Sequence, residues 1–122
     1  MNTNPIYLAA YGTIKQGFSN NGVLRYKGNS FIGQGVTKEK YAMYRRGIPF
    51  VIKEPRTQIV VDVFEVAPQN IGIVDRLEGH PDWYKRELIP VLIDGKELDC
   101  WLYFMTNENV KNYQFVSTGN YQ

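Results

Sequence analysis

One carboxylate, Glu78, stands out as able to do acid–base chemistry, because it falls on the apolar face of a predicted helix. At about 100° per residue, Ile71, Val74 and Leu77 form one apolar stripe on a helix over residues 69–78. Glu78 lies about 20° from Ile71 by the same geometry, inside the stripe. The helix therefore presents a carboxylate towards the interior or towards a cleft.

Two effects should raise the pKa of Glu78. Burial disfavours the charged form, and the dipole at a helix C-terminus disfavours negative charge. Both move the pKa towards the neutral range that suits proton transfer. The alternative is that the last turn drifts out of phase and leaves Glu78 in solvent. Gly79 and Pro81 end the predicted helix directly after Glu78. Trp83 and Tyr84 follow this break and could wall a pocket beside Glu78, whereas His80 does not share its helix face. We expect His80 to stabilise the turn or to lie at the surface.

A glycine-rich loop after the first predicted strand offers a second place for chemistry. The strand, residues 6–11, is apolar and aromatic, and Gly12 ends it. Backbone N–H groups in such a loop can turn towards a bound anion, and the loop also carries Thr13 and Lys15. It lacks both phosphate-binding patterns, Gly-x-x-x-x-Gly-Lys and Gly-x-Gly-x-x-Gly. Taken alone, the pattern is explained more simply by an ordinary turn.

Strands must supply most of the framework that positions these residues. Runs of β-branched and aromatic residues predict strands over residues 31–37, 41–44, 50–52, 59–66, 87–93 and 98–104, with a turn at residues 47–49. Asp94-Gly95 lies between the last two runs and predicts a hairpin. We therefore expect an α+β fold over a single domain, residues 1–122. It would be a small mixed, mostly antiparallel β-barrel with the helix beside it.

The composition excludes several classes of function. The formal net charge is +2 and the densest basic pair is Arg45-Arg46, so no nucleic-acid partner is expected. Cys100 and His80 are the only residues of their types, which argues against a His/Cys metal site and favours a reducing, cytoplasmic location. Cys100 itself should be a small buried apolar residue. No apolar run approaches the roughly 20 residues of a transmembrane helix, so no membrane partner is expected either.

Six short segments, in order along the chain, carry a resemblance to a known family. They are Tyr11-Gly12-Thr13-Ile14-Lys15, Ile48-Pro49-Phe50, Val63-Phe64-Glu65-Val66, the segment from Asp75 through Glu78 to Arg86, Trp101-Leu102-Tyr103-Phe104, and Ser117-Thr118-Gly119-Asn120-Tyr121. Together they resemble the gamma-glutamyl cyclotransferase-like superfamily, most closely its gamma-glutamylamine cyclotransferase and AIG2-like branch. The resemblance covers nearly the whole chain and implies a small mixed barrel with flanking helices.

The resemblance also implies a reaction and a site. Such enzymes cleave a small γ-glutamyl amide by intramolecular attack, releasing 5-oxoproline and a free amine or amino acid, without a metal or organic cofactor. Glu78 would be the general base and acid. The residues implied in substrate binding are Tyr11, Gly12, Thr13 and Ile14, with Tyr84 and Tyr103 lining the pocket. The alternative is a non-catalytic module on the same fold that binds a small ligand or a protein.

Two departures from the family pattern bear on substrate choice. Ile14 stands where leucine is more usual, and Val61 stands where the family strand usually has glycine. If that glycine makes room near the pocket, the substrate space is altered here. The leaving amine and the oligomeric state stay open at the level of sequence.

Overall fold

The structure, a computed structural model, describes residues 6–12, 29–46, 48–107, 110 and 112–121. Within them the strands are β1 (Ile6–Ala10), β2 (Ser30–Thr37), β3 (Tyr41–Arg46), β4 (Ile48–Thr57), β5 (Val60–Val66), β6 (Tyr84–Ile93), β7 (Lys96–Met105) and β8 (Gln114–Phe115). The 3-10 helix η2 (Pro68–Asn70) leads directly into α1 (Ile71–Glu78). None of the helices in this part of the chain is long and apolar enough to cross a membrane.

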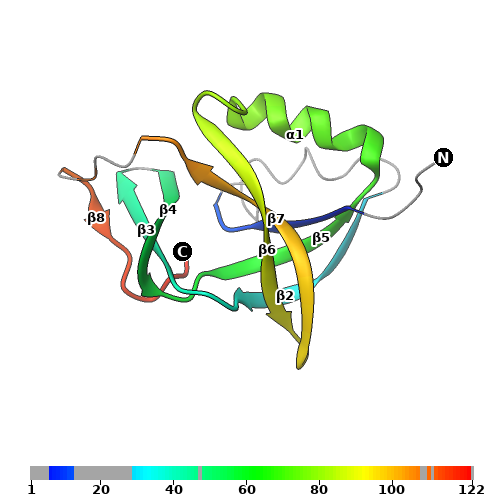
Figure 1. The fold of residues 1–122 in the computed structure, drawn as a ribbon, viewed down its shortest axis with the longest axis horizontal. Helices are drawn as coiled ribbons and strands as arrows, with labels where there is room; N and C mark the ends of the chain where they lie inside the picture. The colour runs from blue at the N-terminus through cyan, green and yellow to red at the C-terminus, as the bar shows by residue number, and fades with distance from the viewer. Residues whose placement is uncertain (1–5, 13–28, 47, 108–109, 111, 122) are drawn as a thin grey trace.

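Five strands close into a barrel in the order β1-β5-β2-β6-β7, and α1 lies along its outside (Figure 1). Neighbouring strands are antiparallel except β1 and β7, which pair in parallel at Leu8 and Trp101 and close the barrel. The prediction of a mixed, mostly antiparallel barrel is therefore confirmed.

The two faces of β1 explain why its sequence is apolar without alternation. Side chains on a strand point alternately to opposite faces. Ala9 packs into the barrel interior, whereas Leu8 and Ala10 pack on the outside in a cluster that contains Val74 of α1. Because α1 covers the outer face, both faces of β1 are buried and the strand leads the chain into the space beside the helix.

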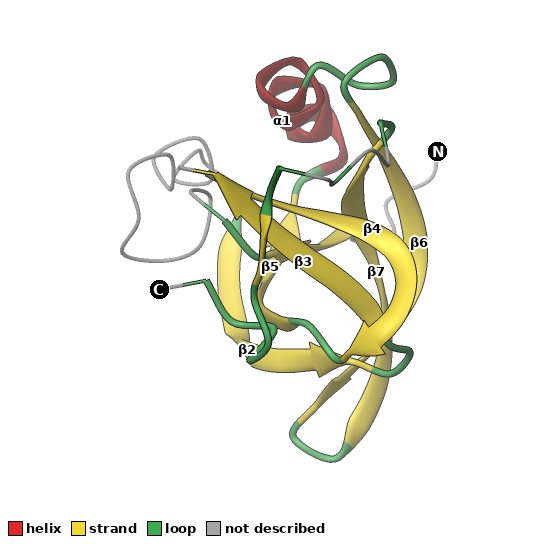
Figure 2. Ribbon diagram, turned by 90° about the vertical axis from the view of Figure 1, so that its left-hand side faces the viewer, coloured by secondary structure: helices red, strands yellow, loops and turns green. Residues whose placement is uncertain are grey.

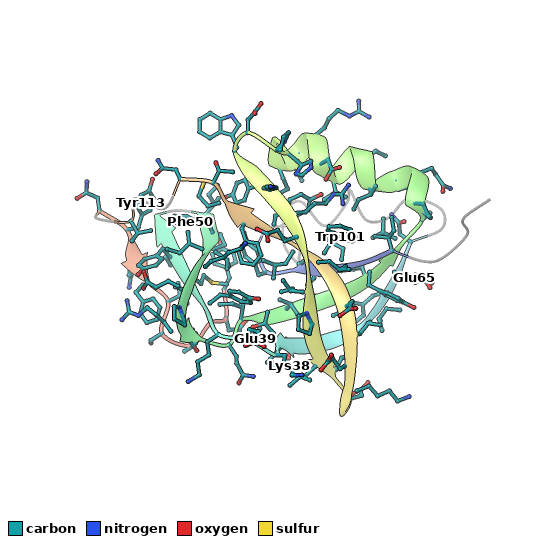
Figure 3. All side chains as sticks on the ribbon, in the orientation of Figure 1. Lys38, Glu39, Phe50, Glu65, Trp101 and Tyr113 are labelled. Carbon is teal, nitrogen blue, oxygen red and sulfur yellow. The ribbon has the colours of Figure 1, made fainter. Side chains whose placement is uncertain are left out.

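A second sheet, in the order β4-β3-β8, lies beside the barrel (Figure 2). Tyr44 and Phe50 of this sheet lie in one core cluster, with Phe115 packed against it. The rings of Phe50 and Tyr113 meet edge to face at 4.8 Å (Figure 3). The turn predicted at residues 47–49 was wrong for Ile48 and Pro49, which begin β4 and pair with β3. Proline is tolerated there because β4 is an edge strand of this sheet.

The hairpin of β6 and β7 is confirmed, and it is longer than predicted. Asp94 and Gly95 form its turn with φ of 50° and 74°, the positive values that a two-residue turn of this kind requires. Pairing runs from Ile93 and Lys96 back to Tyr84 and Met105. This length places Tyr84 on a strand, whereas the predicted strand began at residue 87.

Candidate active site

A cavity of about 140 Å³ opens between the end of α1 and the ends of the neighbouring strands. The described residues that line it are Leu8, Ala9, Ala10, Tyr11, Gly12, Ile48, Pro49, Leu77, Glu78, Tyr84 and Tyr103. Five of the predicted site residues, from three distant parts of the chain, thus meet around one space. The other two, Thr13 and Ile14, lie outside the described residues.

Glu78 is the last residue of α1 and faces this cavity. The helix ends directly after it because Gly79 adopts φ 64°, and the His80 N–H donates to the Asp75 carbonyl at 2.9 Å. Val74, one turn earlier, is fully buried and anchors the helix to the barrel. Burial raises the pKa of Glu78 to about 7. A carboxyl with such a pKa exchanges protons readily at neutral pH.

Two expectations about the surroundings of Glu78 need correction, and the place of Val61, left open by the sequence, can be given. Leu77 is 43% exposed and lies at the rim of the cavity, because α1 rests on the barrel through Val74 and its last turn projects beyond that contact. Trp83 does not wall the cavity: it is 71% exposed and packs over the helix end, where a Cβ on Gly79 would lie 2.9 Å from its ring. Val61 is buried in the barrel core, so its side chain does not line the cavity.

Tyr11, Tyr84 and Tyr103, which line the cavity with Glu78, have raised pKa values and keep their protons. The Tyr11 hydroxyl donates to the Tyr103 carbonyl at 2.7 Å, so it ties the exit of β1 to β7 and its proton is already engaged. Burial, followed by the charges of Tyr84 and Glu78, raises the pKa of Tyr11. Burial and then the charge of Glu78 raise the pKa of Tyr84 to about 12. Among its described lining residues, the cavity therefore offers neutral phenols beside the carboxyl group of Glu78.

An ion pair beside the cavity was missed by the sequence reasoning. Asp75 Oδ1 accepts hydrogen bonds from the Tyr103 hydroxyl at 2.5 Å and from Arg86 Nε at 2.8 Å. Asp75 precedes Glu78 by three residues, so the two share a helix face. This spacing could have indicated that Asp75 lies near the site, although it does not identify Arg86 as its partner. The Arg86 N–H also donates to His80 Nδ1 at 3.3 Å, which fits the predicted turn-stabilising role of His80.

Other nucleophile and metal chemistry finds little support in the described part of the chain. Cys100 is buried, and desolvation raises the pKa of its thiol to about 12, so it stays protonated and unreactive. Among the described residues, His, Cys, Asp and Glu side chains form no group of three or more that could hold a metal ion.

The cost of burying Glu78 predicts a pH-dependent gain in stability for Glu78→Gln. The folded-state pKa of about 7 exceeds the usual 4.5, so the wild type loses stability as pH rises between these values. At pH 8 we expect the amide variant to be more stable by about 2 kcal/mol, and at pH 4.5 to be equal. Urea unfolding at both pH values measures this, and an equal difference at both would contradict it.

Comparisons with known proteins match nearly the whole chain. The family model described as "Gamma-glutamyl cyclotransferase, AIG2-like" matches residues 8–122. A candidate gamma-glutamylcyclotransferase of Methanocaldococcus jannaschii is 44% identical over 100 residues, which cover 80% of this chain and 82% of that protein. Another, of Drosophila melanogaster, is 36% identical over 106 residues, covering 80% of this chain and 68% of that protein.

The fold has close counterparts among solved structures. An AIG2-like protein of Mus musculus superposes with a TM-score of 0.85 over 98% of this chain and 89% of that one, at 22% identity. A protein from Pyrococcus horikoshii superposes with a TM-score of 0.71 over 94% and 88%, at 21% identity. At these identities the superpositions show a shared fold and nothing about substrate.

Proposed function

This chain belongs to the gamma-glutamyl cyclotransferase, AIG2-like family of enzymes, and from that premise we propose that it cleaves a γ-glutamyl amide to 5-oxoproline and a free amine or amino acid. The observation that carries the proposal is the position of Glu78. Its carboxyl, with a pKa raised by burial to about 7, faces a cavity of about 140 Å³. That size suits a group of amino-acid dimensions better than a drug-sized ligand.

The proposed reaction needs one acid–base group. The α-amino nitrogen of the substrate attacks its own γ-amide carbonyl, so a ring C–N bond forms and the C–N bond to the leaving amine breaks. Glu78 takes one proton from the α-ammonium group and passes it to the leaving nitrogen, and the second proton that the attacking nitrogen loses on ring closure ends on the released amine, which leaves as an ammonium ion. Because nucleophile and carbonyl belong to one molecule, holding the chain in a folded conformation supplies much of the rate.

We assign substrate binding to the strand end beside Glu78. Tyr11 and Gly12 lie at the exit of β1 and line the cavity together with Pro49. We propose that the backbone amides of Tyr11 and Gly12, together with Thr13 and Ile14 as the family resemblance implies, bind the substrate carboxylate or the developing oxyanion. Such fixed donors stabilise negative charge without reorganising. The single thiol, Cys100, supports a reducing, cytoplasmic location.

Incubation with a panel of γ-glutamyl compounds tests the proposal. The panel contains γ-glutamyl amino acids, γ-glutamyl-ε-lysine, simple γ-glutamyl amines and glutathione, and 5-oxoproline is measured by mass spectrometry. Release from any member supports the reaction, and the best substrate identifies the leaving group. Binding without release from folded protein would favour the alternative, a non-catalytic ligand-binding module.

The pKa of Glu78 predicts the acid limb of the pH–rate profile. A general base acts when ionised, and the ionised fraction of a carboxyl with a pKa of about 7 falls tenfold per pH unit below that value. We therefore expect kcat/KM to fall about tenfold between pH 6 and pH 5. Initial rates from pH 5 to pH 9 measure this. An acid limb centred near pH 4.5 would show that Glu78 is solvated in the free enzyme.

A further inference from the structure

The Arg86–Asp75 pair connects three elements that meet at the cavity. Asp75 is on α1, and Arg86 and Tyr103 are directly opposite each other on β6 and β7. Both donate to the same oxygen of Asp75. The guanidinium of Arg86 also lies 4.5 Å from the ring centre of Trp101, which Figure 3 labels on the side of the barrel below α1. The pair is therefore held from two sides.

The pair is a defined polar contact and not a loose surface bridge. The side chains of Arg86 and Asp75 are 21% and 18% exposed, against 50% and 48% for the surface pair Lys38–Glu97. Desolvation alone would raise the pKa of Asp75, but the hydrogen bonds from Arg86 and Tyr103 outweigh it and lower that pKa. Asp75 is thus an ionised acceptor for the Tyr103 proton throughout the neutral range.

The hydrogen bond to Asp75 determines what the Tyr103 hydroxyl can offer to a ligand. A phenol has one proton to donate and two lone pairs that accept. The proton of Tyr103 is committed to Asp75, and burial followed by that hydrogen bond raises the pKa of Tyr103 well above its usual value. Towards the cavity, which Tyr103 lines, the hydroxyl can only accept.

We propose that the Arg86–Asp75 pair fixes the Tyr103 hydroxyl so that its oxygen accepts a hydrogen bond from the amino group of the substrate. This rests on the proposed function, in which that amino group is the nucleophile. Tyr103 touches the substrate, and Asp75 and Arg86 are positioning residues.

The placement of Asp75 relative to Glu78 makes the amino group the natural partner. The two acids are three residues apart on α1, where Cβ atoms are about 5–6 Å apart. The Tyr103 hydroxyl, bound to Asp75, therefore lies near the carboxyl of Glu78, whose charge contributes to its raised pKa. An ammonium group that gives one proton to Glu78 has further N–H donors to direct at this acceptor.

Two probe ligands test the proposal: γ-glutamylmethylamide and glutaric acid mono(methylamide), which lacks only the α-amino group. Their binding is measured by calorimetry on full-length protein carrying Glu78→Gln, so that turnover does not interfere. Adding Tyr103→Phe should weaken the γ-glutamyl ligand about tenfold and the glutaryl ligand less than about twofold. An equal loss for both ligands, or none for either, would overturn the assignment of Tyr103.

Asp75 variants test the positioning role. Asp75→Ala frees the Tyr103 proton to point into the cavity, so we expect the same selective loss of the γ-glutamyl ligand. Asp75→Asn keeps an acceptor oxygen for the Tyr103 hydroxyl, so this variant should keep most of the affinity for the γ-glutamyl ligand. Glu97→Gln, which breaks the exposed pair with Lys38 on the side of the barrel away from α1 (Figure 3), should change neither affinity. Loss in the asparagine variant equal to that in the alanine variant would refute positioning through the hydroxyl.

Release of 5-oxoproline by the wild type separates the two proposals. If the wild type turns over substrate but Tyr103→Phe weakens both ligands equally or neither, the role of Tyr103 is overturned and the reaction stands. Selective binding without turnover of any panel member overturns the reaction and leaves Tyr103 as an amino-group site. Failure of γ-glutamylmethylamide to bind at millimolar concentration counts against both.

Discussion

Glu78→Gln should lower kcat for 5-oxoproline release about 10³-fold, because it removes the only group in the proposed reaction that moves a proton. The amide is nearly the same size as the carboxyl, so the cavity keeps its shape. It can neither take a proton from the α-ammonium group nor return one to the leaving nitrogen. Rates are compared by mass spectrometry on the best substrate of the panel.

The loss must come from chemistry and not from unfolding. Glu97→Gln is the matched control, since it makes the same change in an exposed ion pair, and it should retain wild-type rates. The expected higher stability of Glu78→Gln at pH 8 gives a second control in the same protein. Turnover by Glu78→Gln within about tenfold of wild type would eliminate Glu78 as the acid–base group.

Gly119→Ala should destabilise the fold by about 3 kcal/mol or more, with a fall in Tm of about 10–15 °C. Gly119 has φ 67°, and an added Cβ would lie 2.1 Å from the backbone oxygen of Gln58. The Gly119 carbonyl also accepts from the Val60 N–H at 2.8 Å, which ties the C-terminal segment to the start of β5. Backbone atoms on both sides leave no flexible side chain to move aside.

Gly72→Ala is the matched control for this substitution. Gly72 is exposed in α1, and an added Cβ there would meet nothing within 4 Å. Alanine favours the helix over glycine, so we expect a gain of about 0.5–1 kcal/mol. Thermal and urea unfolding measure both variants. Equal stability of Gly119→Ala and wild type would show that the C-terminal segment can leave β5 without cost.

The sequence by itself determined the features that depend on residues close together in the chain. The face on which Glu78 lies follows from helical periodicity, and the stop after it follows from Gly79. The hairpin turn at Asp94-Gly95 follows from the positive φ values that these residues tolerate. Seven of the strands were predicted at least in part, because β-branched and aromatic runs favour extended backbone. The short β8 was not predicted, and β4 is longer than the predicted residues 50–52.

Only the tertiary structure decided which of these residues meet. Tyr103 reaches Asp75, 28 residues away, because the register of β6 against β7 sets Tyr103 opposite Arg86 and the helix docks above both. Neither register nor docking is encoded in local periodicity, so no partner for Asp75 was predicted. Trp83 and Leu77 were misplaced for the same reason. Val74 is the only buried residue of the helix, and the surroundings of the other helix residues depend on neighbours distant in the chain.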